Sequence, residues 1–549
     1  MDTKTQNEHK EREHFFSQAK VVAAITLVSR IFGFFRDMGI TSLGANRYTD
    51  AFGMAFQIPN LFRRLFGEGA LTSSFVPVFT EVNEKDGFKK ASDLLANAFG
   101  WLAIFLAVLL IIGEIGFLVF SLVPGPEDRG LLAVLAMIML PYMFTVCLLA
   151  LCSAALNCRG HFAYPAAAPI IFNIFGIIAA WFIAPLLQNA LQRQLIIVAF
   201  SIIAAGIVQL IAVLWLLKRS GFNLRPRLKP VEVGIKPIVA MLAPMLLPLG
   251  FLQLSEFLQK VIAWNLTATE AAPNFVIFGH TIAYPLTGGV ITRVQAAQNF
   301  YQFPMGVLAI SLGVAVFPLL SRYAARNDIV NLKDTINRAL RLSLMEGMAT
   351  GVGLFVLAEP IMMIYARRKF SVDDAMQAAF VLKLYVLGMW AYCSYQIVLR
   401  AFYASKDTKT PLRVSCVLAV FNLLLLLVLV WIPGMGPGAF GLSTTLTFAA
   451  NVLILIYLLR KRLGILGGRK IAISLVRTAI ACTVMAAVVY ALRWYMQDMN
   501  NLLILGACVP VGAAIFLGVA WLLGAPELAE FRGGIKASKE AKTQEIPQQ

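Results

Sequence analysis

Fourteen apolar segments are long enough to cross a lipid bilayer as helices, and this repetition limits the possible folds more than any other feature. A helical span needs about 20 predominantly apolar residues. The second and eighth segments are too long for one regular span, and prolines interrupt both. We therefore predict an all-α polytopic membrane protein with spans at 19–43, 50–80, 92–121, 131–157, 162–186, 194–217, 237–266, 283–320, 341–364, 376–403, 412–432, 437–459, 474–494 and 501–523.

The composition excludes several other classes of protein. Hydrophobic residues make up 59% of the 549 residues and charged residues 14%, which is too little polar surface for soluble domains of this total size. The seven cysteines form no Cys-x-x-Cys pair, so neither a zinc site nor a disulfide framework is indicated. No motif for covalent catalysis, metal-dependent hydrolysis or nucleotide binding is present. We expect neither an enzyme nor a bound cofactor.

The net charge of +18 is explained by orientation in the membrane. With the N-terminus in the cytoplasm, 32 of the 47 basic residues fall in cytoplasmic segments and 7 on the opposite side. Cytoplasmic loops of membrane proteins carry such an excess of Lys and Arg. We therefore predict that both termini are cytoplasmic and that the cations contact anionic lipids of the bilayer rather than nucleic acid.

A weak internal repeat divides the chain into two halves. Gln57-Ile58-Pro59 and Gln302-Phe303-Pro304 lie 245 residues apart, in the second and eighth spans. Six spans per half give both halves the same orientation, which predicts two six-helix lobes around a central cavity. We expect a solvated tail at 1–18, a first lobe at 19–217, a basic linker at 218–236, a second lobe at 237–459, a final helix pair at 460–523 and a solvated tail at 524–549.

Arginines inside the first two spans are the candidate functional residues. Each central arginine costs about 2.5–3.5 kcal/mol if it faces lipid, so these side chains must face water, a partner or a ligand. A guanidinium group pairs bidentately with phosphate oxygens, which favours an anionic headgroup such as a diphosphate. Structural ion pairs are the alternative, and Arg64 fits them equally well. The arginines are Arg30, Arg36 and Arg63, and the acids available to them are Asp37, Asp50 and Glu68.

Glu256 in the seventh span has two interpretations. It lies four residues before Lys260, a spacing typical of a mutual salt bridge on one helix. It could instead bind a coupling cation together with Asn422 or Thr445. The four histidines show no metal-binding spacing.

Two sequence blocks, Ser29–Asp37 and Thr49–Pro77, resemble the MurJ/MviN family of lipid II flippases. Shorter matching blocks are Ala155–Asn173, Phe303–Val307 and Phe402–Pro411, so that the resemblance spans most of 15–465. It implies about fourteen helices in two lobes of the multidrug/oligosaccharidyl-lipid/polysaccharide exporter type, which work by alternating access. It also implies that the last two helices form a groove for a polyprenyl tail.

The resemblance implies a function in peptidoglycan synthesis and hence in cell wall biogenesis and cell shape. A flippase of this family would move lipid II, an undecaprenyl-diphosphate-linked muropeptide, from the inner to the outer leaflet of the bacterial inner membrane. The absence of a nucleotide site leaves the membrane potential or a coupling monovalent cation as the energy source. The family's cavity residues correspond here to Arg30, Arg36, Arg63, Asp50 and Glu68, and the same motifs contain Asp37, Asn60 and Arg64.

One position departs from the family pattern. The family has an arginine four residues before the Phe-Pro pair of the eighth span, and this chain has Asn299 there. Arg293 is six residues away, about 120° round the helix, and is an imperfect replacement. The departure leaves open an exporter of another polyprenyl-linked oligosaccharide, or of drugs. A membrane glycosyltransferase would need acidic residues in a sizeable outer loop, and the sequence has none.

Overall fold

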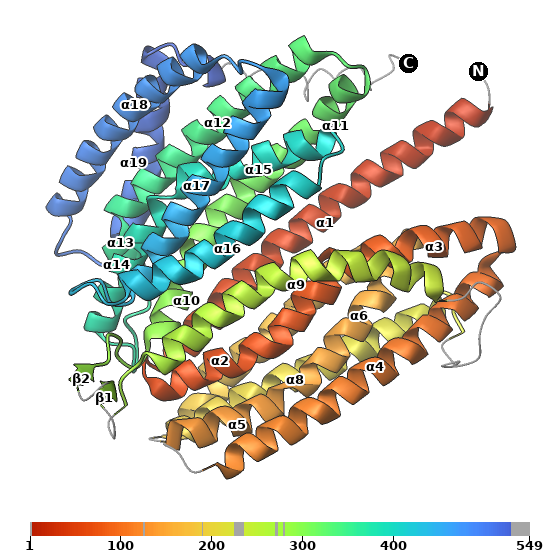
Figure 1. Cartoon of the computed structure of the whole chain (residues 1–549), viewed down its shortest axis with the longest axis horizontal. Coiled ribbons are helices and arrows are strands. Elements are labelled where there is room, and N and C mark those ends of the chain that lie inside the picture. The colour runs from red at the N-terminus through yellow and green to blue at the C-terminus, as the bar shows by residue number, and fades with distance from the viewer. Residues whose placement is uncertain are drawn as a thin grey trace. The chain divides into compact units, whose positions relative to one another are not determined.

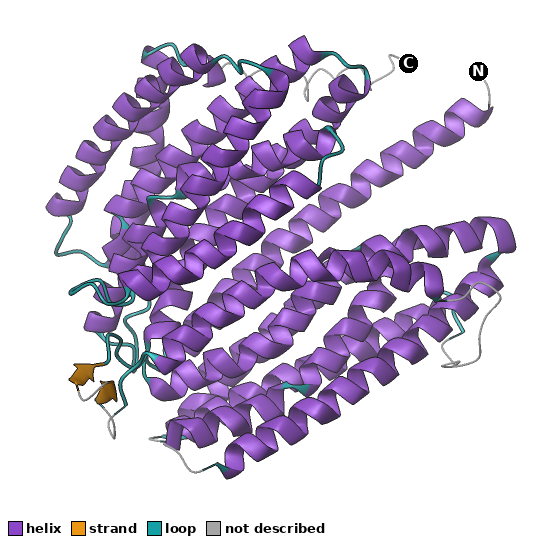
Figure 2. Ribbon diagram, viewed as in Figure 1, coloured by secondary structure: helices purple, strands orange, loops and turns teal. Residues whose placement is uncertain are grey.

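The computed structural model describes residues 3–123, 127–188, 190–223, 235–269, 273–277 and 280–528. Within these ranges, the side chains of 3–20, 23, 67–70, 72, 243–245, 247–249 and 277 lie outside the description. Helices account for almost all of the described chain (Figure 2). The prediction of an all-α protein is therefore met, apart from one short hairpin.

The described chain forms two compact units. Unit 1 comprises Met1–Thr292 with Arg368–Phe370, and unit 2 comprises Arg293–Arg367 with Ser371–Gln549. The division falls inside α10 (Val290–Pro304), so the helix of the seventh predicted span, α9 (Lys236–Asn265), groups with unit 1. The lobe boundary expected at the basic linker 218–236 remains a prediction.

Unit 1 contains nine α-helices among its described residues, and all of them except α7 are labelled in Figure 1. A capping box starts α2, because Asn46 accepts from the backbone N–H of Thr49 and Thr49 accepts from that of Asn46. Phe75 and Phe79 of α3 pack with Leu94 and Leu95 of α4 in a buried core. The helices are α1 (Thr3–Thr41), α2 (Arg47–Phe62), α3 (Leu71–Asp86), α4 (Phe88–Leu122), α5 (Glu127–Met139), α6 (Pro141–Cys158), α7 (Ala163–Ile177), α8 (Leu191–Arg219) and α9.

Unit 2 begins within α10 and contains nine further α-helices in the described residues. Side chains cap the starts of α12 and α14, where Asp328 and Ser371 accept from backbone N–H groups. Leu340 of α12, Phe402 of α15 and Leu455 of α17 lie in its buried core. The helices are α11 (Ile310–Ala325), α12 (Ile329–Val356), α13 (Ala358–Met363), α14 (Val372–Val386), α15 (Met389–Ala404), α16 (Lys409–Leu429), α17 (Gly438–Leu463), α18 (Gly468–Tyr495) and α19 (Asn501–Leu522).

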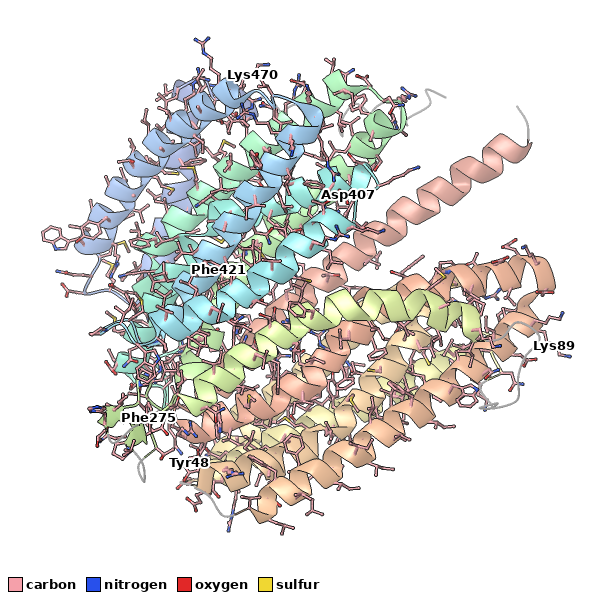
Figure 3. All side chains as sticks on the ribbon, in the orientation of Figure 1. Tyr48, Lys89, Phe275, Asp407, Phe421 and Lys470 are labelled. Carbon is pink, nitrogen blue, oxygen red and sulfur yellow. The ribbon has the colours of Figure 1, made fainter. Side chains whose placement is uncertain are left out.

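Every predicted span coincides with helix, although not every helix has the composition of a simple span. In the described part of the chain, ten helices are long and apolar enough to cross a membrane, or eleven if α14 and α15, bent by 43° at their junction, count as one span. The three other predicted spans are α1, the α2–α3 region and α9. The first two carry the intramembrane arginines, and α9 includes side chains outside the described part. Exposed apolar side chains such as Phe421 of α16 cover the spans, as expected for lipid-facing helices (Figure 3).

The two long predicted spans each contain a π-helical segment. Arg63–Ala70 follows Pro59 and joins α2 to α3, and Met305–Ala309 follows Pro304 and joins α10 to α11. Proline removes a backbone donor and clashes with the preceding turn, and π-helical turns are one way in which a helix absorbs such a disturbance. The repeated proline motif therefore accompanies the same local distortion in both halves.

A β-hairpin precedes α10 and was not expected from the sequence. β1 (Asn274–Ile277) pairs antiparallel with β2 (His280–Ala283) (Figure 2). Consequently the eighth span begins at Val290 and not at residue 283. The predicted start was too early because the residues before α10, such as Ala283, Tyr284 and Leu286, extend the apolar run.

Candidate substrate-binding site

Arg36 of α1 is held by a defined set of partners in unit 1. Its Nε and Nη2 donate to Asp37 Oδ1, at 2.9 and 2.6 Å, and its Nη1 donates to Asn173 Oδ1 at 2.8 Å. Asn173 of α7 in turn donates to the backbone oxygen of Ser29 at 2.8 Å. A guanidinium has five N–H groups, so these bonds leave one N–H on each terminal nitrogen for another acceptor.

Small and aromatic residues of α7 determine where the Arg36 side chain lies. A Cβ at Gly176 would be 2.6 Å from Arg36 Cγ, so only glycine lets the arginine stem lie against this turn. The guanidinium lies over the ring of Phe172, 4.9 Å from its centroid, in a cation–π contact. That ring stacks on Tyr142 and Phe56, at 5.3 and 6.2 Å. An oriented arginine beside an aromatic cluster is suited to a phosphorylated, ring-containing ligand.

The π-helical segment after Pro59 begins with the next two predicted arginines. Arg63 Nε donates to Asn60 Oδ1 at 2.9 Å. Arg64 forms an ion pair with Glu256 of α9 and donates to Gln253 Oε1 at 3.3 Å. Glu256 is thus an ion-pair partner of Arg64, a contact that the spacing to Lys260 did not suggest. Arg64 is therefore engaged in a structural ion pair in this structure, which was the alternative to a ligand contact.

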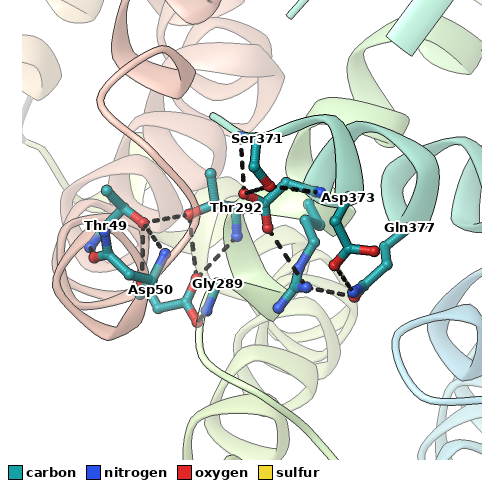
Figure 4. A network of polar contacts seen from close by, with 10 residues as sticks. Thr49, Asp50, Gly289, Thr292, Ser371, Asp373 and Gln377 are labelled. Carbon is teal, nitrogen blue, oxygen red and sulfur yellow. Dashed lines mark hydrogen bonds and ion pairs between the residues drawn. The ribbon is translucent and has the colours of Figure 1, made fainter. Parts of the chain in front are cut away.

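Asp50 of α2, predicted at the substrate site, contacts the start of α10 within unit 1 (Figure 4). Its side chain is 1% exposed. It accepts from the backbone N–H of Gly289 at 2.8 Å and from both the N–H and the hydroxyl of Thr292, at 3.0 and 3.1 Å. A carboxylate that accepts unsatisfied N–H groups at a helix N-terminus stabilises that terminus. In this structure Asp50 joins α2 to α10 and is closed to solvent.

The structure says less about Arg30 and Glu68. Arg30 is an exposed residue of α1, six positions before Arg36. The side chain of Glu68 lies outside the described residues. Neither can be assigned a contact with a ligand from the geometry, and both remain predicted site residues.

The two candidates of α10 in unit 2 are engaged by neighbouring side chains. Arg293 is 3% exposed, lies 3.6 Å from Asp374 of α14 and donates to Gln377, which is labelled in Figure 4. Asn299 accepts from Gln295 at 3.1 Å. Arg293 is buried and hydrogen-bonded in this structure, so it is not open to a phosphate here. Its substrate role, like that of Asn299, remains untested.

The residues weighed for a cation site are separately engaged. In unit 2, Asn422 Nδ2 donates to Thr447 at 3.1 Å, and Thr445 donates to the backbone oxygen of Leu384 at 2.8 Å. In unit 1, Glu256 pairs with Arg64. Among the described residues no group of three or more His, Cys, Asp or Glu could hold a metal ion. A coupling cation at these residues remains a prediction.

Asn173 and Phe172 were not chosen as site residues from the sequence. The signal available was an amide inside an otherwise apolar helix, within the block Ala155–Asn173. Its position relative to Arg36 depends on a contact over 137 residues, which no local pattern reveals.

The fold defines a multi-pass, all-helical membrane protein. Two solved structures have the same fold. A lipid II flippase MurJ in an inward closed conformation has a TM-score of 0.72 at 21% identity, covering 91% of this chain and 98% of that one. An inward-facing multidrug resistance MATE family transporter has a TM-score of 0.63 at 12% identity, covering 82% and 98%.

Sequence comparison identifies the family. The family model described as lipid II flippase MurJ matches residues 40–507. A probable lipid II flippase MurJ of Vibrio cholerae is 27% identical, over 92% of this chain and 95% of its own length. The lipid II flippase MurJ of Burkholderia cenocepacia is 28% identical, over 93% and 98%. The chain belongs to the MurJ family, which confirms the predicted fold class and the expectation of a transporter and not an enzyme.

Proposed function

We propose that this chain is a lipid II flippase, which moves the undecaprenyl-diphosphate-linked muropeptide from the inner to the outer leaflet for cell wall synthesis. The observation that carries the proposal is the family match over residues 40–507. Arg36 and Arg63 of unit 1 support it, because a guanidinium group can pair bidentately with the phosphate oxygens of a diphosphate. The bilayer is the second partner of the chain.

Arg36 is the residue that we assign to the diphosphate. Its bonds to Asp37 and Asn173 orient the guanidinium and leave two N–H groups on the terminal nitrogens. Asp37 also offsets the charge, so the cluster is stable before the ligand arrives. Arg63 begins the π-helical segment that packs against α6, the helix that carries Tyr142 of the aromatic cluster. We assign Arg30, Arg63, Asn60 and Glu68 supporting roles around the headgroup.

Transport by alternating access requires the outer ends of helices to part. The bonds between Asp50 and the start of α10 are candidates for contacts that break in that step. We also propose that both termini are cytoplasmic, from the distribution of basic residues. The energy source is assigned to the membrane potential or a coupling monovalent cation.

The proposal is tested with purified protein in proteoliposomes that contain fluorescent lipid II. Arg36→Ala should reduce transport at least tenfold, because a charge-assisted hydrogen bond is worth about 1.5–3 kcal/mol. Arg64→Ala is the matched control within the same two spans and should retain most transport, since Arg64 is paired with Glu256. Transport at the wild-type rate by Arg36→Ala would overturn the assignment of Arg36. A wild-type protein that moves drugs or another prenyl-linked saccharide but not lipid II would overturn the function.

A further inference from the structure

One residue after α19, Glu527, is buried within unit 2, although the sequence suggested a solvated tail from residue 524. Glu527 is 1% exposed and is the one buried acid among the described residues of unit 2. It lies 3.1 Å from Arg341 Nη1 of α12 and accepts from the hydroxyl of Ser474 of α18 at 2.8 Å. A buried carboxylate is tolerated only when it is paired and hydrogen-bonded. Both conditions hold here, so Glu527 ties the end of the described chain to two helices.

A turn at Gly524 directs the chain back to this position. Gly524 has φ +63°, a left-handed conformation that favours glycine. Its N–H donates to the oxygen of Trp521, and the N–H of Ala525 donates to the oxygen of Ala520, which together form a Schellman motif. Arg477 of α18 donates to the oxygen of Gly524 at 3.0 Å. The return of the chain is therefore specified by local geometry and by a side chain of the neighbouring helix.

The opposite end of α18 is attached to the same unit. Arg493 donates to the backbone oxygen of Val356, the last residue of α12, at 2.8 Å, and forms an ion pair with Glu359 of α13. Glu359 also lies 2.6 Å from Lys383 of α14. Charged contacts thus hold α18 near both of its ends, while exposed apolar side chains such as Val476 and Tyr490 cover its length.

We propose that Gly524–Leu528 is a clasp, with Glu527 as a positioning residue, that holds the α18–α19 pair on α12 in the arrangement that binds a polyprenyl chain. The inference rests on the proposed function and on the polyprenyl groove that the family resemblance implies for this helix pair. A pair that is already ordered binds a flexible chain without the entropic cost of ordering itself. The clasp therefore acts on tail affinity and not on recognition of the headgroup.

The test separates tail from headgroup by using two probes on the full-length protein in nanodiscs. Undecaprenyl phosphate reports the tail, and soluble UDP-N-acetylmuramoyl-pentapeptide reports the headgroup. Glu527→Ala should weaken the binding of undecaprenyl phosphate about tenfold, because α18 and α19 must then become ordered when the lipid binds. The affinity for the soluble probe should stay within about twofold of the wild-type affinity. The matched control is Asp407→Ala, which removes an acid paired with Arg462 in the same unit, away from α18 and α19. It should leave both probes unchanged.

A structural readout independent of lipid binding accompanies these measurements. Spin labels at the exposed positions Val330 of α12 and Val476 of α18 should show a broader distance distribution in Glu527→Ala than in wild type. Ser474→Ala and Arg477→Gln remove one contact each and keep the test possible if Glu527→Ala does not fold. Exchanging the charges, Arg341→Glu with Glu527→Arg, should restore part of the tail affinity.

The outcomes distinguish the clasp from the function on which it rests. An unchanged distance distribution together with wild-type binding of undecaprenyl phosphate in the Glu527 and Ser474 variants would overturn the clasp. Equal weakening of both probes would also overturn it, because that result indicates a general loss of structure. The third outcome is that Glu527→Ala broadens the distance distribution while the wild-type protein binds neither probe. This outcome would support the clasp as a structural device and overturn the proposed function.

Discussion

Replacing Asp50 by alanine tests whether this residue binds substrate, as its motif suggests, or stabilises the start of α10, as the contacts indicate. The side chain is 1% exposed and accepts bonds from Gly289 and Thr292. Alanine would leave two backbone N–H groups without this acceptor in a buried place. We therefore expect the main effect of Asp50→Ala to fall on stability and on the conformational equilibrium.

The size of the effect follows from the bonds that are lost. An unsatisfied buried donor costs about 1–3 kcal/mol, and two are created. Removing a negative charge from the N-terminus of α10 adds about 0.3–1 kcal/mol. The total of about 2–7 kcal/mol should lower the apparent melting temperature by about 2–6 °C for a chain of 549 residues. Asp50→Asn should lose roughly half as much, because one amide oxygen remains as an acceptor while the amide N–H₂ faces the other donor.

The assay is thermal unfolding of detergent-solubilised protein, measured beside binding of the soluble UDP-muropeptide. Thr292→Val is the matched control, since it removes the hydroxyl that contacts Asp50 and Thr49, each at 3.1 Å, and keeps the backbone N–H that Asp50 accepts from. It should cost about 0.5–1.5 kcal/mol. The stability order should therefore be wild type, Thr292→Val, Asp50→Asn and Asp50→Ala. An Asp50→Ala protein that melts like wild type but no longer binds the headgroup would refute the reasoning and return Asp50 to the substrate site.

Two further predictions concern single contacts. Asn173→Ala removes the amide oxygen that orients Arg36. The variant should bind the headgroup about tenfold more weakly in a titration, and its melting temperature should change little. Unchanged affinity would mean that Asp37 alone orients the guanidinium. Burial acts to raise the pKa of Asp407, but hydrogen bonds from Thr410 and Arg462 outweigh it and hold this pKa below its usual value. The charged form of Asp407 therefore stabilises the fold above pH about 4, and this contribution, less than about 1 kcal/mol, disappears as pH falls through the lowered pKa. Melting curves of Asp407→Ala and wild type should differ at pH 7 and converge below pH 4, and a constant difference would contradict the pairing.

The helices were predictable because each is specified by its own apolar run. Lipid offers the backbone no hydrogen-bond partner, so a run of about 20 apolar residues becomes a helix whatever its neighbours are. The start of α10 was misplaced because residues 283–289 are apolar enough to extend the run, although they follow a hairpin. The π-helical turns were foreshadowed only by Pro59 and Pro304, which mark a disturbance without defining its form.

The residue types of the candidate site could be proposed from the sequence, but their arrangement could not. The cost of burying a cation singled out Arg36 and Arg63 without any knowledge of the fold. Their partners could not be derived in the same way, because Asn173 reaches Arg36 from a helix 137 residues away. Asp50 and Glu527 show the same limit. Asp50 depends on backbone N–H groups at residues 289 and 292, and Glu527 depends on the side chains of Arg341 and Ser474. In both cases the partners come from a distant part of the chain.

The pairing of Arg36 with Asp37 bears on how such a site can select a diphosphate. A bare guanidinium inside the membrane would attract any small anion and would destabilise the helix that carries it. With Asp37 and Asn173 in place, three of its five N–H groups are occupied and the remaining two lie on the terminal nitrogens. A monovalent halide gains little from a group whose charge is already offset. A diphosphate carries more charge and presents paired oxygens, so it can use both remaining donors at once and recruit a second arginine. The carboxylate thus raises selectivity at the expense of affinity, and the cluster discriminates by geometry more than by charge.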